Sequence, residues 1–189
     1  MTRALLLIAI AACSDRSADP APAPASPPGP ASKPDRVAGP ITVRDPNGAI
    51  VLELVTAAGK CTAKPAPDPK LTIDRASNGD QILRDGKNVV RVWRDATRPG
   101  HVDLVDPDGM AVARIDSTAA AATLTDAAGR PTSTVVFEGG RFVAKDPNEA
   151  VLAYVQGGDA EIAALVVAPL PPDVRALAAC DRLTAPVSL

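Results

Sequence analysis

Aromatic and imidazole side chains are scarce in this 189-residue chain. Phe, Trp and Tyr together make up 2% of the residues, and His101 is the single histidine. So few rings argue against stacking platforms for single-stranded nucleic acid or for sugars. The 20 basic residues are balanced by 22 acidic ones and form no basic stripe, so we expect no nucleic-acid partner.

Sequence signatures of catalysis and of cofactor binding are also missing. A Ser-His-Asp hydrolase would have to use His101, yet no Gly-x-Ser-x-Gly motif occurs, and a lone histidine after Pro99-Gly100 is predicted to be an exposed loop residue. Neither of the common glycine-rich phosphate loops is present. A structural zinc site needs four Cys or His ligands, and the three cysteines and one histidine of this chain cannot supply them once one cysteine carries a lipid and the other two are paired, as argued below. We therefore expect no enzyme, with no catalytic residue, no metal and no cofactor.

The N-terminus has the layout of an export signal. Residues 1–12 contain one basic residue, Arg3, followed by an apolar run of about nine residues. A helix of that length is too short to cross a hydrocarbon core of roughly 30 Å. Residues 1–12 are therefore interpreted as a signal peptide.

The apolar run ends in Ile10-Ala11-Ala12-Cys13, which resembles the lipobox of bacterial lipoproteins. In that family the cysteine is acylated and becomes the mature N-terminus, so the resemblance implies a lipid on Cys13 that holds the chain to a membrane of the cell envelope. In enterobacterial members an Asp in the next position favours the inner membrane, so Ser14 indicates the outer membrane. The alternative is an ordinary signal peptide with Cys13 as an incidental thiol.

A Pro/Ala/Ser-rich stretch follows and extends to residue 40. It has almost nothing to pack, and such sequences favour extended, polyproline-like chain. Residues 13–40 are therefore predicted to be the lipid-anchor cysteine and a disordered linker, and residues 41–189 a single β-rich domain.

Short apolar runs alternate with turn signals in that domain, as in antiparallel hairpins. Asp85, Asp106, Asp126 and Asp146 begin successive turns at spacings of 21, 20 and 20 residues, and Asp45 lies about two periods upstream. One hairpin per period predicts an antiparallel meander of roughly twelve short strands, closed as a barrel or a sandwich. The Asp-x-x-Gly frames also offer oxygen ligands, but calcium loops need further acidic positions, so turn chemistry accounts for them. The expected strands include residues 50–55, 89–93, 102–105, 111–115, 134–137, 141–143 and 151–155.

The C-terminus departs from this rhythm. Residues 162–167 are a last apolar run, and Pro172 and Asp173 suit the first turn of a helix. Val174, Leu177 and Cys180 then share one helical face. A meander of about twelve strands with one C-terminal helix is similar in architecture to the tubby-like and LURP-one-related proteins, in which a barrel surrounds a C-terminal helix. The sequence carries no motif of that group, and no binding site is transferred from it.

Cysteine counting adds one covalent prediction. If Cys13 is acylated, Cys61 and Cys180 remain as an even pair, which in an exported protein indicates a disulfide. The alternative is two buried free thiols.

The sequence thus predicts a membrane-anchored envelope lipoprotein with a non-enzymatic binding or structural β-domain, and an envelope protein as its candidate partner. The alternative is a carrier that holds a small ligand or a lipid in a barrel lumen, which would need a roomy apolar cavity.

Overall fold

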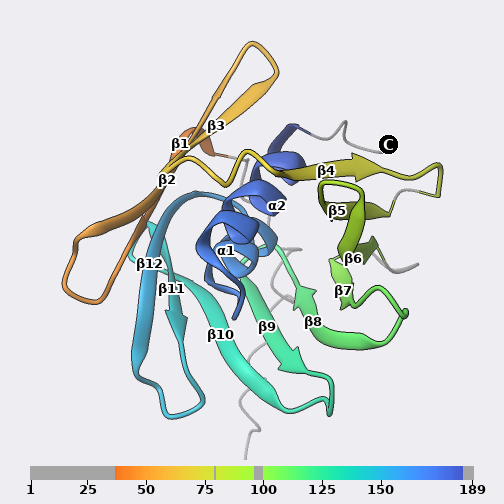
Figure 1. Ribbon diagram of the computed structural model, residues 1–189. Coiled ribbons are helices and arrows are strands. Elements are labelled where there is room, and N and C mark those ends of the chain that lie inside the picture. Colours follow the sequence, from red (N-terminus) through yellow and green to blue (C-terminus); the bar gives the residue numbers. More distant parts are fainter. Residues whose placement is uncertain (1–36, 79, 96–99, 185–189) are drawn as a thin grey trace, which may run out of the picture. The chain divides into compact units, whose positions relative to one another are not determined.

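The computed structural model describes residues 37–184 except 79 and 96–99. The predicted signal peptide, Cys13 and most of the predicted linker lie outside the described residues. Twelve strands and two helices make up the described chain (Figure 1). The strands are β1 (Val37–Arg44), β2 (Ile50–Ala57), β3 (Lys60–Lys64), β4 (Leu71–Arg75), β5 (Gln81–Asp85), β6 (Asn88–Asp95), β7 (His101–Val105), β8 (Ala111–Ser117), β9 (Ala121–Asp126), β10 (Pro131–Glu138), β11 (Arg141–Lys145) and β12 (Val151–Gly158).

All twelve strands belong to one antiparallel sheet. Its order is β3-β2-β1-β12-β11-β10-β9-β8-β7-β6-β5-β4, so the first strand pairs with the last. The predicted twelve-stranded meander is confirmed, but the sheet is not closed into a barrel, because β3 and β4 are its two ends. The segment between them contains Pro65, Pro67 and Pro69, which have no N–H group to continue a ladder of hydrogen bonds.

The first strand begins at Val37, four residues before the predicted start of the domain. Gly39 and Pro40, which the sequence placed in the linker, lie within β1. The pairing with β12 is irregular there, since the register shifts between Val37 and Thr42. A strand accepts a proline at such an irregularity, where no ladder hydrogen bond is lost.

The turns with the period of 20 residues all lie at the same end of the strands, because every second turn of an antiparallel meander does so. In four of them the leading Asp has the same role: its Oδ1 accepts the backbone N–H four residues further on, over 2.8–2.9 Å. The carboxylates are therefore used within their own turns, as the sequence predicts. These four residues are Asp45, Asp106, Asp126 and Asp146.

One of these turns breaks the pattern at its fourth position. Three of them have glycine there, with φ between +76° and +87°: Gly48, Gly109 and Gly129. The fourth turn has Glu149, with φ +65°. A side chain in this left-handed region costs roughly 1–2 kcal/mol relative to an ordinary backbone conformation. The chain thus carries backbone strain at Glu149, between β11 and β12.

Two helices, not the single predicted one, follow the sheet: α1 (Ala160–Val167) and α2 (Pro172–Thr184). The prediction of α2 is confirmed, whereas α1 coincides with the apolar run at 162–167 and was missed. Asp159 caps α1 by accepting the N–H of Ile162 over 2.9 Å. Because α1 is buried on nearly every side, its sequence has no polar face to reveal helical periodicity.

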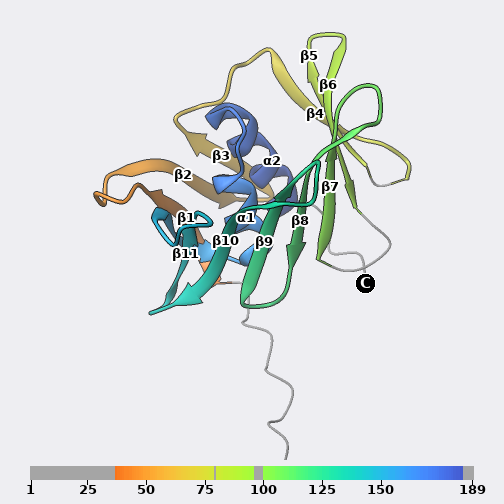
Figure 2. The same cartoon turned by 90° about the horizontal axis from the view of Figure 1, so that it is seen from below.

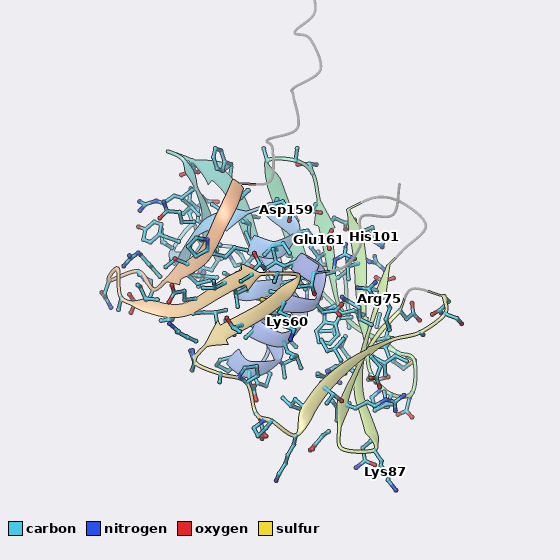
Figure 3. The ribbon with its side chains drawn as sticks, turned by 90° about the horizontal axis from the view of Figure 1, so that it is seen from above. Lys60, Arg75, Lys87, His101, Asp159 and Glu161 are labelled. Carbon is cyan, nitrogen blue, oxygen red and sulfur yellow. A yellow bond between two sulfur atoms is a disulfide. The ribbon has the colours of Figure 1, made fainter. Side chains whose placement is uncertain are left out.

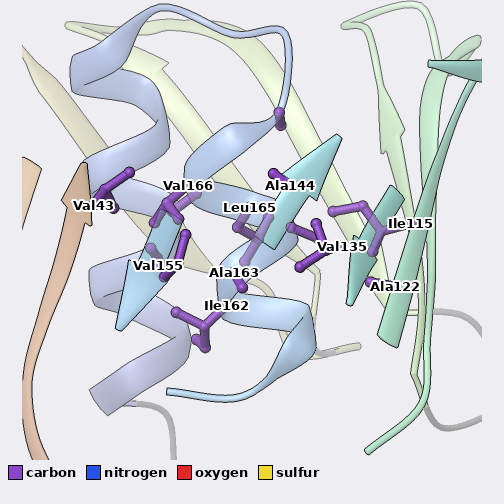
Figure 4. Packing of buried hydrophobic residues seen from close by; sticks show 14 of the residues in the cluster. Val43, Ile115, Ala122, Val135, Ala144, Val155, Ile162, Ala163, Leu165 and Val166 are labelled. Atoms are coloured by element: carbon purple, nitrogen blue, oxygen red, sulfur yellow. The ribbon is translucent and has the colours of Figure 1, made fainter. Parts of the chain in front are cut away.

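The hydrophobic core lies between α1 and the inward face of the curved sheet (Figure 2). Helix α1 contacts strands β8 to β12. In Figure 4, Ile162, Leu165 and Val166 of α1 meet Val135 and Val155 of the sheet. All five side chains are at most 2% exposed, so the concave face of the sheet is filled by the protein's own chain.

Helix α2 spans the gap between the two ends of the sheet and contacts both β3 and β4 (Figure 3). On one side a disulfide joins Cys180 to Cys61 of β3, with Cα atoms 5.3 Å apart. On the other side Asp181 accepts hydrogen bonds from Arg75 of β4, over 2.7 Å, and from Gln81 of β5. Two consecutive helix residues therefore hold opposite ends of one open sheet.

Candidate functional site

The main candidate site is a hollow of about 540 Å³ on the outward face of β11 and β12. In these strands Ala144 and Val155 point into the core, while the residues that alternate with them point away from the helices. Val151 departs from this alternation because it lies beyond a register shift between β11 and β12. The hollow has a floor that includes Val143 and Val151. Its polar lining consists of Glu138, Arg141, Lys145, Tyr154 and Gln156, and the Gly139-Gly140 turn closes one side.

Arg141 is the most distinctive of these residues. Its guanidinium carbon lies 4.1 Å from the centre of the Tyr154 ring, which is a cation–π arrangement. Among the residues that the structure describes, no carboxylate forms an ion pair with Arg141. One face of the guanidinium is thus covered by an aromatic ring, and its N–H groups are available at the edge.

Lys145, the second cation of the hollow, is neutralised by two carboxylates. Its Nζ lies 3.1 Å from Glu138 and 3.8 Å from Glu149, the strained turn residue. The hydrogen bond to Glu138 and the attraction of both carboxylates raise the pKa of Lys145. Lys145 therefore stays protonated and paired, and Arg141 is left as the cation that can take a further anion.

This arrangement suits binding. Small-molecule sites measure roughly 300–1,000 Å³ and combine an apolar floor with a few placed polar groups. A planar guanidinium fixed against a ring can donate two parallel hydrogen bonds to an oxyanion. The lining supplies no histidine, cysteine or serine as a nucleophile or a base of ordinary hydrolytic chemistry.

His101 forms a separate cluster on β7 and β8, and its predicted exposure is wrong: the residue is 8% exposed. Its Nδ1 lies 2.5 Å from an oxygen of Asp116, and its Nε2 lies 3.7 Å from Asp103. Asp103 also pairs with Arg114 over 2.8 Å, and this hydrogen bond raises the pKa of the guanidinium. Cross-strand pairing of β7 with β8 brings these charges together, which a sequence without strand register cannot show.

The His101 cluster has the chemistry of a structural ion-pair network. An Asp–His pair is part of a hydrolase triad, but the neighbouring hydroxyl, on Ser117, donates to the carbonyl of Gly100 over 3.1 Å. A Cβ on Gly100 would lie 2.2 Å from the Ser117 carbonyl oxygen, so only glycine fits at this crossing. The close approach of the two strands explains the glycine before His101.

Of the site residues predicted from the sequence, Cys61 and Cys180 are brought together as a disulfide, and Cys13 lies outside the described residues. Within the described part of the chain no three His, Cys, Asp or Glu side chains gather in a way that could hold a metal ion. Nor does that part contain a helix with the length and hydropathy of a membrane span.

Sequence reasoning missed the hollow entirely. Arg141 and Tyr154 are thirteen residues apart and meet only because β11 pairs with β12. One signal was present in the sequence: Glu149 stands where the repeated turn has glycine elsewhere, and backbone strain is often retained at functional sites.

Comparison with known proteins does not assign the chain to a family. No protein-family model matches it, and no curated protein or solved structure gave a significant match either.

Proposed function

We propose that the chain is a lipoprotein of the bacterial cell envelope, anchored by a lipid on Cys13, whose β-domain binds a ligand or a partner and does not catalyse a reaction. The observation that carries the anchor is the Ile10-Ala11-Ala12-Cys13 sequence directly after a short apolar run. Ser14 favours the outer membrane. One acyl chain anchors a protein only weakly, so several chains on the same cysteine, as in the lipoprotein family, are part of the proposal.

The spacing between anchor and domain supports a tethered binding module. The 23 residues between Cys13 and Val37 are rich in Pro, Ala and Ser. An extended chain of that composition reaches roughly 70 Å at about 3.1 Å per residue. The β-domain would therefore reach ligands or envelope partners well beyond the lipid headgroups.

The shape of the sheet favours binding on its outward face over a carrier role. A carrier needs an apolar cavity of several hundred cubic ångströms. The apolar cavity at Trp93, Leu104 and Leu165, between sheet and α1, measures about 10 Å³, which is room for a single water molecule at most. The larger hollow lies on the opposite face of the sheet, among polar side chains.

The similarity to tubby-like and LURP-one-related proteins stays a prediction. In that interpretation α2 would replace the last strand pairing of a barrel, since it holds both β3 and β4. The proposal of a binding module does not depend on it.

Sedimentation of the full-length chain tests the anchor. In a bacterial host the chain should pellet with membranes and band with the outer membrane in a density gradient, and Cys13→Ala should move it to the soluble envelope fraction. Ser14→Ala is the matched control and should leave the chain membrane-bound. If Cys13→Ala pellets as the parent chain does, a lipid on Cys13 is not what holds the protein.

A further inference from the structure

We propose that the outward hollow binds the carboxylate of a small monoanionic ligand through Arg141, which Tyr154 holds in place. This inference rests on the proposed binding function and names its site and its ligand class.

Arg141 has a fixed orientation before any ligand binds. A free arginine loses considerable rotamer entropy when it binds. Here the guanidinium already lies 4.1 Å over the Tyr154 ring, and Tyr154 belongs to a strand paired on both sides, with Val143 of β11 and Arg44 of β1. A ring on a doubly paired strand is a rigid support. The stacked guanidinium can donate only in its own plane, which is the direction that a carboxylate needs for two parallel hydrogen bonds.

The charges around the hollow favour a ligand with a single negative charge. Its lining contains two cations, Arg141 and Lys145, and one anion, Glu138. Glu138 and Glu149 both pair with Lys145, so the charges of these four side chains sum to zero, and Arg141 is the cation without a carboxylate partner among the described residues. A ligand with one negative charge can pair with Arg141 and adds only one charge to this balance. A phosphate monoester would bring about −1.5 to −2 at neutral pH and would place the excess charge near Glu138.

The backbone strain at Glu149 lies beside the hollow. The three sister turns have glycine at this position and carry no carboxylate there. In the turn beside the hollow, the side chain of Glu149 instead reaches Lys145 at 3.8 Å. Among these four turns, the backbone strain thus occurs in the turn where it places a carboxylate, that of Glu149, beside Lys145.

The remaining lining indicates what the ligand body offers. Gln156 provides an amide that can both donate and accept, and the floor at Val143 and Val151 is apolar. A carboxylate next to a small apolar group and a neutral amide fits this lining. The C-terminal residue of a peptide has this chemistry.

The test is an NMR titration of the full-length chain carrying Cys13→Ser, so that no acyl group contributes. The probe is N-acetylalanine, and its neutral counterpart is N-acetylalanine amide. We expect saturable shifts of the Arg141 Nε–H signal and of the backbone amide signals of Tyr154 and Gln156 with the acid, and none with the neutral amide. The backbone amide signals also report binding in variants that lack Arg141. Arg141→Ala should weaken binding of the acid about tenfold or more, the loss typical for a charged hydrogen bond.

Further variants separate the site from general charge and from misfolding. Tyr154→Phe keeps the ring and should bind within about twofold of the parent, whereas Tyr154→Leu removes the support and should bind several-fold more weakly. Arg141→Lys keeps the charge without the planar fork and should also bind several-fold more weakly, which gives a reading even if Arg141→Ala does not fold. Arg130→Ala removes an exposed arginine in the turn between β9 and β10 and should have no effect.

Two results would overturn the inference: undiminished binding to Arg141→Ala, or no saturable binding of the acid to the parent chain. Tighter binding of inorganic phosphate, or of vesicles with phosphatidylglycerol, would overturn the ligand class in favour of a phosphate or a lipid headgroup. The Cys13→Ser chain lacks the lipid, so this titration tests carboxylate binding alone. Sedimentation of the full-length chain tests the lipid anchor separately, and either proposal can therefore fail without the other.

Discussion

Removing the disulfide between Cys61 and Cys180 should destabilise the domain by roughly 4 kcal/mol. The bridge closes a loop with a sequence separation of 119 residues, for which the chain-entropy relation gives close to 5 kcal/mol as an upper value. Native-state strain and residual structure in the unfolded chain usually reduce such values. The ion pair of Asp181 with Arg75 remains after reduction, so α2 should stay against β4 and the loss should come mainly from the freed unfolded chain.

The assay is urea denaturation of the full-length chain, with and without a reducing agent. In a thermal melt, a loss of about 4 kcal/mol in a domain of this size lowers the melting temperature by roughly 8–16 °C. The urea dependence should become steeper on reduction, because an unfolded chain without a cross-link exposes more surface. A Cys61→Ala/Cys180→Ala variant should match the reduced parent apart from the small cost of the truncated Cys180 side chain, and should not respond to the reducing agent.

Two observations would refute this reasoning. One is an unchanged urea midpoint of the parent chain on reduction. The other is two reactive thiols, besides Cys13, on labelling of the unfolded and unreduced protein, which would mean that the bridge does not form.

Three further predictions concern the turns. Gly100→Ala should destabilise the domain by about 3 kcal/mol or more, because the new Cβ would lie 2.2 Å from a carbonyl oxygen of β8. Gly109→Ala has open space around the new Cβ and should cost only about 1–2 kcal/mol, as thermal melts of the two variants would show. Glu149→Gly should stabilise the domain by about 0.5–1 kcal/mol in the same assay by relieving its positive φ, and a loss of stability would contradict the strain. Hydrogen bonds to Asp126, first from the Arg130 backbone N–H and then from the Arg130 side chain, lower the pKa of the carboxyl below its ordinary value of 3.8. Asp126 therefore stabilises the fold above that pH, and its contribution is lost as the pH falls through the lowered pKa. Asp126→Asn should remove that part of the acid sensitivity in thermal melts between pH 6 and pH 2.

The sequence was sufficient for the features that depend on local patterns. The period of about 20 residues between Asp-led turns predicted the twelve-stranded meander, because each of these turns is specified by its own Asp, followed by Gly in all but the turn with Glu149. The Pro172-Asp173 start and the apolar spacing after it predicted α2. The even cysteine remainder indicated the pair Cys61 and Cys180.

What the sequence could not supply depends on strand register and on the third dimension. Helix α1 is buried on nearly all sides, so its apolar run reads equally well as a strand. The enclosure of His101 by Asp103 and Asp116, and the stacking of Arg141 on Tyr154, arise between neighbouring strands whose residues are paired only in the folded sheet. The open ends at β3 and β4 could not be predicted, because the sequence does not show which strands lie at the edges of the sheet; the three prolines between them mark an interruption of the strands but not its effect on closure.

Mass spectrometry of the N-terminal peptide of the mature protein, isolated from its own membrane, tests the central claim most directly. We expect a peptide that begins at Cys13 and carries a mass increment of several acyl chains. An unmodified Cys13, or a peptide that still begins at Met1, would contradict the assignment of this chain as a lipid-anchored envelope protein.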